Sequence, residues 1–185
     1  TSNTIYTSFK IKNTKKDFLK DCHVIIWTTT PWTIPANRAL AYSSKIKYSI
    51  IHMGRDSEHF QNKNIIIASE LVKKVSEDCN FQDFKVLKEF SGNEFESTVC
   101  QHPLIDLRYN YNVPMLEGDF VTLEQGTGIV HTAPMHGPDD FNLCLKHGIK
   151  APDTMNDAGI YTDEIPFFSG MHIFKADSTI IDKLS

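Results

Sequence analysis

The chain has 185 residues and a formal net charge of −4, from 19 Lys and Arg against 23 Asp and Glu. Its hydrophobic fraction of 41% and charged fraction of 23% are typical of a globular domain and exclude collagen, coiled coil and wholesale disorder. The length suffices for one domain with a sizeable core, and we predict a single domain over residues 1–185.

Neither the apolar runs nor the first residues indicate a membrane protein. The longest aliphatic stretches, 24–27 and 65–68, have four residues each, whereas a spanning helix needs roughly 20. The chain begins with Thr1, and no basic and then apolar signal follows. We therefore expect no membrane contact, and we expect this chain to be a fragment of a longer protein.

The spacing of the cysteines indicates the redox compartment, and the net charge limits the kind of nucleic-acid contact that the chain can make. The cysteines lie far apart, so neither a zinc knuckle nor a disulfide framework is indicated, and we expect a reducing cytoplasm. Because a mildly acidic chain cannot wrap nucleic acid by charge alone, any nucleic-acid contact must be local. The lysines between residues 10 and 20 are expected to form a solvated face rather than a phosphate-binding one.

Short strands dominate the predicted elements. Runs of β-branched and apolar residues between turn residues predict strands at 22–27, 39–42, 47–53, 64–68, 84–90, 119–123 and 129–132. The strands do not alternate with helices. The fold class expected is therefore α+β, with a compact β-barrel-like core of short strands and flanking helices.

Three helices are expected to flank this core. The first begins at an N-cap, Ser69, and runs to about residue 79. The second lies between Gly137 and Gly148, which mark its two ends. A short third helix is capped by Asp177. The buried face of the second helix is expected to consist of Phe141, Cys144 and Leu145.

Segment 27–37, Trp-Thr-Thr-Thr-Pro-Trp-Thr-Ile-Pro-Ala-Asn, has an unusual composition. Two prolines four residues apart fix φ and remove donors, so we expect a stiff, extended, non-helical loop. Side-chain alternation then puts Thr28 and Thr30 on one face and Thr29 on the other. Hydroxyls and backbone N–H groups at a strand end could wall a polar substrate; the alternative is a threonine-rich sheet edge.

Segment 126–141 combines a Gly-x-Gly turn, a strand, a tight loop and a helix start. No Gly-Lys-Ser/Thr follows the glycines, which excludes a nucleotide P-loop. Asp139 and Asp140 fall in the first helical turn, where simple capping of the helix dipole is one interpretation. With His131 and His136 they could instead bind a metal, but a five-residue histidine spacing across a proline and a glycine does not favour this, and we expect no metal.

Together the two segments resemble the signatures of the editing (connective peptide) domain of isoleucyl-tRNA synthetases, a class I family. The first signature stands intact over 27–37, and the second, from Gly-Thr-Gly through Val-His-Thr-Ala-Pro to His-Gly and Asp-Asp, lies over 126–140. The Thr-Thr-Arg-Pro of the valyl and leucyl enzymes is absent. Met135 stands where the family usually has glycine, a change that could reshape the rim of the pocket.

The resemblance implies a hydrolytic proofreading domain that removes valine from valyl-tRNA(Ile), with valyl-adenylate as a further substrate. By the same resemblance, Asp140 would hold the α-ammonium group of the substrate and His131 would limit the size of its side chain. Backbone N–H groups of Thr29 and Thr30 would stabilise the developing oxyanion. The other implied substrate-binding residues are Thr28, Trp32, Thr33, Asn37, Gly126, Thr127, Gly128, Met135 and His136.

The implied partners are the 3′-terminal adenosine of aminoacylated tRNA(Ile) and the remaining domains of a parent synthetase. We expect no cofactor in this domain. The nucleotide-binding signatures of the synthetase are missing, so ATP and magnesium would belong to the absent synthetic domain, and this chain should not make aminoacyl-tRNA. The alternatives are a free-standing deacylase acting in trans, a non-catalytic module that binds aminoacyl-adenosine, and a metal hydrolase.

Overall fold

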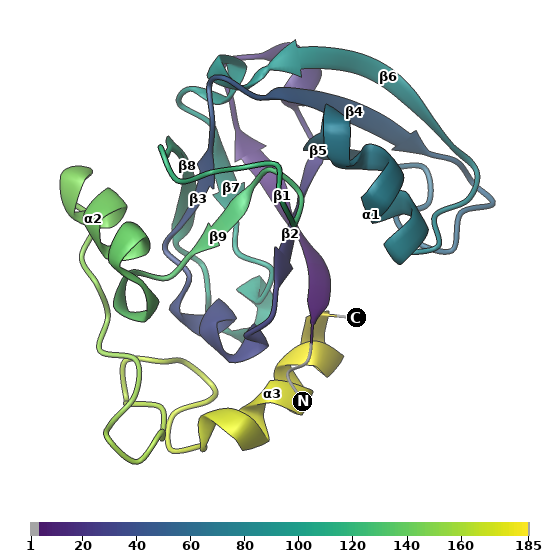
Figure 1. Cartoon of the computed structure of the whole chain (residues 1–185). Helices are drawn as coiled ribbons and strands as arrows, with labels where there is room; N and C mark the ends of the chain where they lie inside the picture. Colours follow the sequence, from purple (N-terminus) through teal and green to yellow (C-terminus); the bar gives the residue numbers. More distant parts are fainter. Residues whose placement is uncertain (1–3, 185) are drawn as a thin grey trace.

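Residues 4–184 are described by a computed structural model, drawn in Figure 1. The strands in this part of the chain are β1 (Ile5–Asn13), β2 (His23–Thr28), β3 (Ala39–Tyr42), β4 (Lys47–Met53), β5 (Asn64–Ala68), β6 (Phe84–Ser91), β7 (Val99–Gln101), β8 (Asn112–Glu117) and β9 (Val130–Thr132). The α-helices are α1 (Val72–Asp78), α2 (Pro138–Lys146) and α3 (Ile173–Leu184). Two of the short 3-10 helices matter for the site: η2 (Pro31–Ala36) and η6 (Pro134–His136).

The strands form one mixed sheet in the order β6-β4-β5-β2-β1-β7-β8-β3-β9. The pairs β2–β5 and β3–β8 are parallel, and the other pairs are antiparallel. The sheet curls, so that the turn before β9 returns to β5, where the Ala68 N–H donates to the Thr127 carbonyl at 2.9 Å. The predicted α+β fold with a barrel-like core of short strands is confirmed, although the sheet stays open, with β6 and β9 at its ends.

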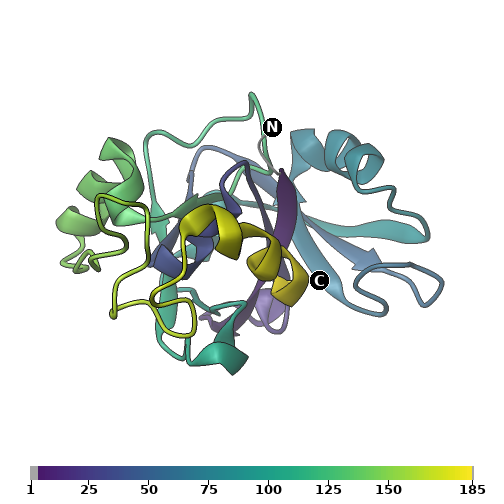
Figure 2. The same ribbon diagram turned by 90° about the horizontal axis from the view of Figure 1, so that it is seen from below.

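The core lies inside this curled sheet. Residues 24–26 of β2 and 65–67 of β5 are at most 1% exposed, as expected for strands covered on both faces, which have continuous aliphatic runs. Seen from below in Figure 2, α1 and α2 lie at opposite ends of the molecule and α3 crosses in front of the curled part. Helix α3 packs against η2 and thereby covers one end of the core.

Six of the seven predicted strands are present, and one is wrong. Residues 119–123 lie in turns after Gly118, and the strand of this region is β8 instead. Strand β8 was not predicted because it contains Pro114, and proline within an apolar run argues against a strand. Strand β1 was not predicted because its buried Phe9 and Ile11 alternate with polar and basic residues. The lysines on it are solvated as expected.

The expectation of an extended loop over 27–37 is wrong, because Pro31 to Ala36 form the 3-10 helix η2. Pro31 stands at the start of the helix, where an N–H has no partner within the helix in any case. The face assignment holds: Thr28 is buried and its Oγ1 lies 3.4 Å from Oγ1 of Thr30, whereas Thr29 is exposed. The segment is therefore compact but keeps the predicted alternation before the first proline.

Each predicted helix exists, with changes in its ends or faces. Ser69 is not a cap: its Oγ lies 2.7 Å from Oγ of Ser49, and a 3-10 turn precedes α1. Helix α3 begins at Ile173, so Asp177 lies inside it. Helix α2 has the predicted ends, but its buried residues are Leu143 and Cys144. Phe141 and Leu145 are 43% and 65% exposed, because the inward face of α2 is the one that carries Asp140.

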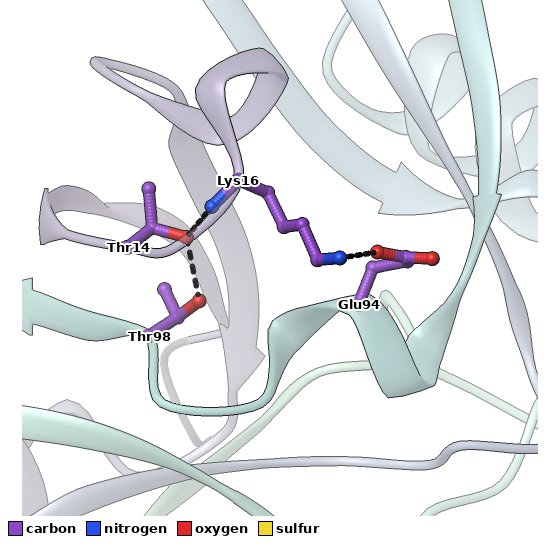
Figure 3. A network of polar contacts seen from close by, with 4 residues as sticks. All are labelled: Thr14, Lys16, Glu94 and Thr98. Carbon is purple, nitrogen blue, oxygen red and sulfur yellow. Dashed lines mark hydrogen bonds and ion pairs between the residues drawn. The ribbon is translucent and has the colours of Figure 1, made fainter.

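A small polar network fastens the end of β1 to the segment before β7 (Figure 3). The hydroxyls of Thr14 and Thr98 lie 3.0 Å apart, and the Lys16 N–H donates to Thr14 Oγ1 at 3.3 Å. Lys16 Nζ also pairs with Glu94 at 3.0 Å. Both charged side chains are partly solvated, so the ion pair adds little stability and the network mainly fixes the local geometry.

Within residues 4–184, no helix has the length and apolar character that a bilayer crossing requires. The four cysteines are free thiols.

His102 is a fully buried histidine that no motif of the sequence indicates. Its Nε2–H donates to the Ile34 carbonyl at 3.0 Å, and its Nδ1 accepts the Leu104 N–H at 3.0 Å. Burial is the main cause that lowers the pKa of His102 to about 3. The ring is therefore neutral in the folded protein.

This histidine predicts a loss of stability in acid. Below about pH 6.5 the unfolded chain binds a proton that folded His102 does not bind until about pH 3. One such group lowers the free energy of unfolding by about 1.4 kcal/mol per pH unit in that window. Urea unfolding from pH 7 to 4 should show a shallower pH slope for His102→Phe than for the wild type. Equal slopes would contradict the assignment.

Candidate functional site

The two unusual segments share a hollow of about 360 Å³ at the end of β2. The carboxyl end of β2, the turn before β9 and the first turn of α2 enclose it. Its size is within the range of small-molecule sites. Its lining residues are Trp27, Thr28, Thr29, Phe120, Thr122, Gln125, Gly126, Thr127, Gly128, Ile129, Val130, Asp139 and Asp140. Thr29 and Asp140 thus face one cavity, as the sequence predicted.

A larger hollow, about 600 Å³ and mostly apolar, lies between β1, α1 and α3. It contains neither of the unusual segments. We place the candidate site in the smaller hollow because that one brings threonine hydroxyls, backbone groups and a carboxylate together.

The Gly-Thr-Gly turn forms one wall of the hollow and is tightly held. Gly126 and Gly128 have φ of 79° and 83°, which strongly favour glycine. The Thr127 hydroxyl donates to the Ile25 carbonyl at 2.6 Å, and the Tyr48 hydroxyl donates to the Gly128 carbonyl at 2.6 Å. The turn is therefore fastened to β2 and β4, and its position relative to the threonine segment is fixed.

The threonines at the opposite wall have different roles. The Thr30 N–H donates to Thr28 Oγ1 at 3.0 Å. This N–H is therefore engaged within the segment, and the expected role of Thr30 at a substrate oxyanion stays a prediction. Thr29 is exposed and lines the hollow, so it remains the candidate donor on this wall.

Asp140 brings a partly buried carboxylate to the hollow. Its Oδ2 accepts the Ala133 N–H at 2.9 Å, which fixes the side chain across the η6 turn. Burial raises the pKa of Asp140, the bond from Ala133 opposes this, and the neighbouring Asp139 adds to the rise. A carboxylate held in partial desolvation gains from an incoming positive charge. The arrangement is suited to an ammonium group.

His131 does not line the hollow: it lies on β9, next to the lining residue Val130, and its ring contacts η2. Its Nε2 is 2.8 Å from Thr33 Oγ1, and the Asn37 Nδ2 donates to its Nδ1 at 2.7 Å. Thr33 donates its own hydroxyl proton to the Thr30 carbonyl at 2.8 Å, so His131 Nε2–H is the donor to Thr33. Burial, with a smaller effect of His136, lowers the pKa of His131 to about 3. The ring is neutral and fixed.

The remaining predicted residues, among them Trp32, Met135 and His136, do not line the hollow. Trp32 and His136 make an edge-to-face contact, with ring centroids 5.1 Å apart. Burial lowers the pKa of His136. Met135 is 52% exposed and does not have a positive φ. A glycine is therefore not required at this position, and the methionine does not narrow the hollow.

Both ring nitrogens of His131 are engaged, which leaves no lone pair for a metal. Among residues 4–184, no group of three His, Cys, Asp or Glu side chains is arranged to hold a metal ion.

Several residues of the site were missed at the level of sequence. Phe120, Thr122 and Gln125 line the hollow; the position of Gln125, directly before the Gly-Thr-Gly turn, was the one available signal. The residues that support η2 from behind were also missed. Tyr111 donates its hydroxyl to the Asn37 carbonyl at 2.7 Å, and Tyr161 donates to the Trp32 carbonyl at 2.5 Å. No local pattern relates these tyrosines to the threonine segment.

No family model matches the chain. Over 183 residues it is 55% identical to the isoleucine–tRNA ligase of Pelagibacter ubique, which covers 99% of the chain and 20% of that ligase. The chain is homologous to one part of the isoleucine–tRNA ligases. A second such ligase, from Gluconobacter oxydans, is 41% identical over 189 residues, again covering 20% of the ligase. The chain thus spans about a fifth of the length of the curated relatives it matches.

Solved structures identify the fold of the chain. The crystal structure of GlLeuRS-CP1 matches it with a TM-score of 0.72 at 13% identity, covering 97% of this chain and 94% of that one. The editing domain of the P. knowlesi cytosolic leucyl-tRNA synthetase matches with a TM-score of 0.66 at 10% identity, covering 97% and 91%. The chain therefore has the editing-domain fold that the sequence resemblance predicted.

The tight turn predicts a specific requirement for glycine at position 128. A Cβ on Gly128 would lie 2.5 Å from Ala68 Cβ, whereas a Cβ on Gly148, which also has positive φ, meets nothing within 4 Å. Both alanine variants are strained at φ, but only Gly128→Ala adds a collision. We expect Gly128→Ala to lower the free energy of unfolding by roughly 1–3 kcal/mol more than Gly148→Ala, measured by urea unfolding at pH 7. Equal losses would show that the turn can move.

Proposed function

We propose that this chain is the hydrolytic proofreading domain of an isoleucine–tRNA ligase and deacylates valyl-tRNA(Ile), with valyl-adenylate as a further substrate. The observation that carries the proposal is the shared hollow, in which the threonine segment faces the partly buried carboxylate of Asp140. Homology to these ligases over 99% of the chain supports the same assignment.

Such an activity is needed because binding alone cannot separate valine from isoleucine well enough. One methylene group in an apolar pocket is worth only about 1–3 kcal/mol, a general limit for which isoleucine and valine on this ligase are the standard example. The synthetic site therefore accepts some valine. A second site that admits the smaller amino acid and hydrolyses its ester removes the error.

In this proposal Asp140 binds the α-ammonium of the valyl group. Burial raises the pKa of the Asp140 carboxyl, and an arriving cation lowers that pKa again because it offsets the desolvation of the carboxylate. Water attacks the ester carbonyl, a C–O bond to the water oxygen forms, and the ester C–O bond breaks. Thr29 offers a donor to the developing oxyanion. The leaving ribose oxygen of the terminal adenosine takes up a proton, which restores its hydroxyl.

His131 does not serve as the general base in this mechanism. Its two nitrogens are occupied by Thr33 and Asn37, and its pKa of about 3 makes it a very weak base at neutral pH. We assign assistance to the attacking water to the neighbouring hydroxyl of the terminal ribose. The role of His131 is steric: with Thr33 it fixes the depth of the site.

The partners proposed are the single-stranded 3′ end of tRNA(Ile) and the remaining domains of the ligase, which would hold the body of the tRNA. A net charge of −4 is compatible with a contact restricted to that end. We propose that the domain works without a cofactor, in the cytoplasm, and that ATP and magnesium serve the synthetic part of the ligase.

The ammonium role is tested with Asp140→Asn in the full ligase. Loss of a charge-assisted hydrogen bond worth roughly 1.5–3 kcal/mol should slow deacylation of valyl-tRNA(Ile) by about 10- to 150-fold. The control is Asp182→Asn, which makes the same substitution at an exposed aspartate on α3, outside the residues that line the hollow. A normal rate for Asp140→Asn, or equal losses in both variants, would refute this role.

The size limit is tested with His131→Ala. Removing the ring leaves a cavity between β9 and η2 and releases Thr33 and Asn37, so the variant should begin to deacylate correctly charged isoleucyl-tRNA(Ile). His52→Ala is the control, because His52 is also a partly buried, hydrogen-bonded histidine but lies on β4, with Asn64 as its partner. Unchanged selectivity in His131→Ala would remove this residue from the size limit.

A further inference from the structure

The helix η2 contains a carbonyl that cannot be paired by the helix itself. In a 3-10 helix each carbonyl accepts the N–H three residues ahead. The Thr30 carbonyl accepts from Thr33 at 2.9 Å and the Ile34 carbonyl from Asn37 at 3.0 Å. The corresponding donor for Trp32 would be residue 35, which is proline and has no N–H. The second proline of the threonine segment therefore leaves a buried acceptor without its usual partner.

Tyr161 supplies the missing donor. Its hydroxyl donates to the Trp32 carbonyl at 2.5 Å across 129 positions of the chain. The side chain is 2% exposed, and its ring packs against Phe168 with centroids 6.0 Å apart. The backbone of Tyr161 is held as well: its N–H donates to Met171 and its carbonyl accepts from Gly170. The hydroxyl is therefore presented from a rigid position.

What Tyr161 holds is directly joined to the site. Trp32 precedes Thr33, whose hydroxyl accepts the bond from His131. The indole of Trp32 contacts His136 on η6. A shift of η2 at the Trp32 carbonyl would therefore move the groups that fix His131 and the corner leading to Asp140.

The other carbonyls of this segment with side-chain donors are less dependent on a single partner. The Ile34 carbonyl accepts from His102 and also from the Asn37 N–H. The Asn37 carbonyl accepts from Tyr111 and also from Arg38 Nη1. Trp32 differs because its partner within the helix is excluded by the covalent structure of proline.

We propose that Tyr161 is a positioning residue of the editing site. Its hydroxyl replaces the N–H that Pro35 lacks and so fixes the position of η2 relative to β9. This position maintains the size limit set around His131. This inference rests on the proposed function for its effect on substrates. Its structural part, the fixing of η2 by one hydroxyl, does not depend on that function.

The structural part is tested by amide hydrogen exchange on this chain. Tyr161→Phe removes only the hydroxyl and should speed exchange of the Thr33 and Asn37 amides by roughly three- to tenfold, the range expected for one lost hydrogen bond. Tyr109→Phe is the matched control, since it also removes a buried tyrosine hydroxyl bound to a carbonyl, that of Pro166 at 2.8 Å. Unchanged exchange in Tyr161→Phe, or equal acceleration in Tyr109→Phe, overturns the proposal.

The functional part is tested by the ratio of deacylation rates on valyl-tRNA(Ile) and isoleucyl-tRNA(Ile) in the full ligase. Tyr161→Phe should lower this ratio at least threefold. In a Pro35→Ala background residue 35 has an N–H for the Trp32 carbonyl, so adding Tyr161→Phe should change the ratio less than twofold. A purely structural loss would not be rescued in this way.

The outcomes separate the two levels of the proposal. A wild-type ligase that does not deacylate valyl-tRNA(Ile) contradicts the proposed function, while the exchange measurement still decides the structural role of Tyr161. A wild-type ligase that edits normally, with the same ratio in Tyr161→Phe, overturns the positioning role alone. An equal effect of Tyr161→Phe in both backgrounds also overturns it, because the missing N–H of Pro35 would then be irrelevant.

Discussion

The geometry of the site depends on how the Gly-Thr-Gly turn is fastened to the sheet. Thr127 donates to β2, Ala68 of β5 donates to Thr127, and Tyr48 of β4 donates to Gly128. The partners lie on three strands that come much earlier in the chain. Ala68 precedes Thr127 by 59 positions, and Ile25 precedes it by 102. Since β9 and α2 follow directly, the turn decides where Asp140 stands relative to the threonine segment.

The rigidity of the opposite wall has a different origin. Two prolines remove N–H donors from the segment that bears Thr33 and Asn37, and the buried Tyr161 supplies a replacement for the N–H that Pro35 lacks. Neutral histidines complete this framework, because a buried charged ring would be strongly unfavourable. A site built this way is preorganised: its groups need little rearrangement when a substrate arrives. Size discrimination by one methylene group requires such rigidity.

Sequence reasoning predicted what local chemistry determines. The aliphatic runs of β2 and β5, the glycine and proline that begin α2, and the meeting of two signatures were all accessible from residue type and order. It failed where long-range contacts override local preference. Strand β8 forms although it contains Pro114, which argues against a strand. Phe141 lies on the exposed face of α2, although local hydrophobicity assigns it to the core. The tyrosines behind η2 have no local signature, since their function is defined only by a carbonyl far away in sequence.

The central claim is that one hollow, between the threonine segment and Asp140, holds an aminoacyl group on its nucleotide. The most direct measurement is a crystal structure of this chain with a non-hydrolysable valyl-adenosine analogue. The account predicts the α-ammonium of the analogue within hydrogen-bond distance of the Asp140 carboxylate, with the carbonyl group facing Thr29. An analogue seated elsewhere, for example in the apolar hollow between β1 and α3, would contradict it.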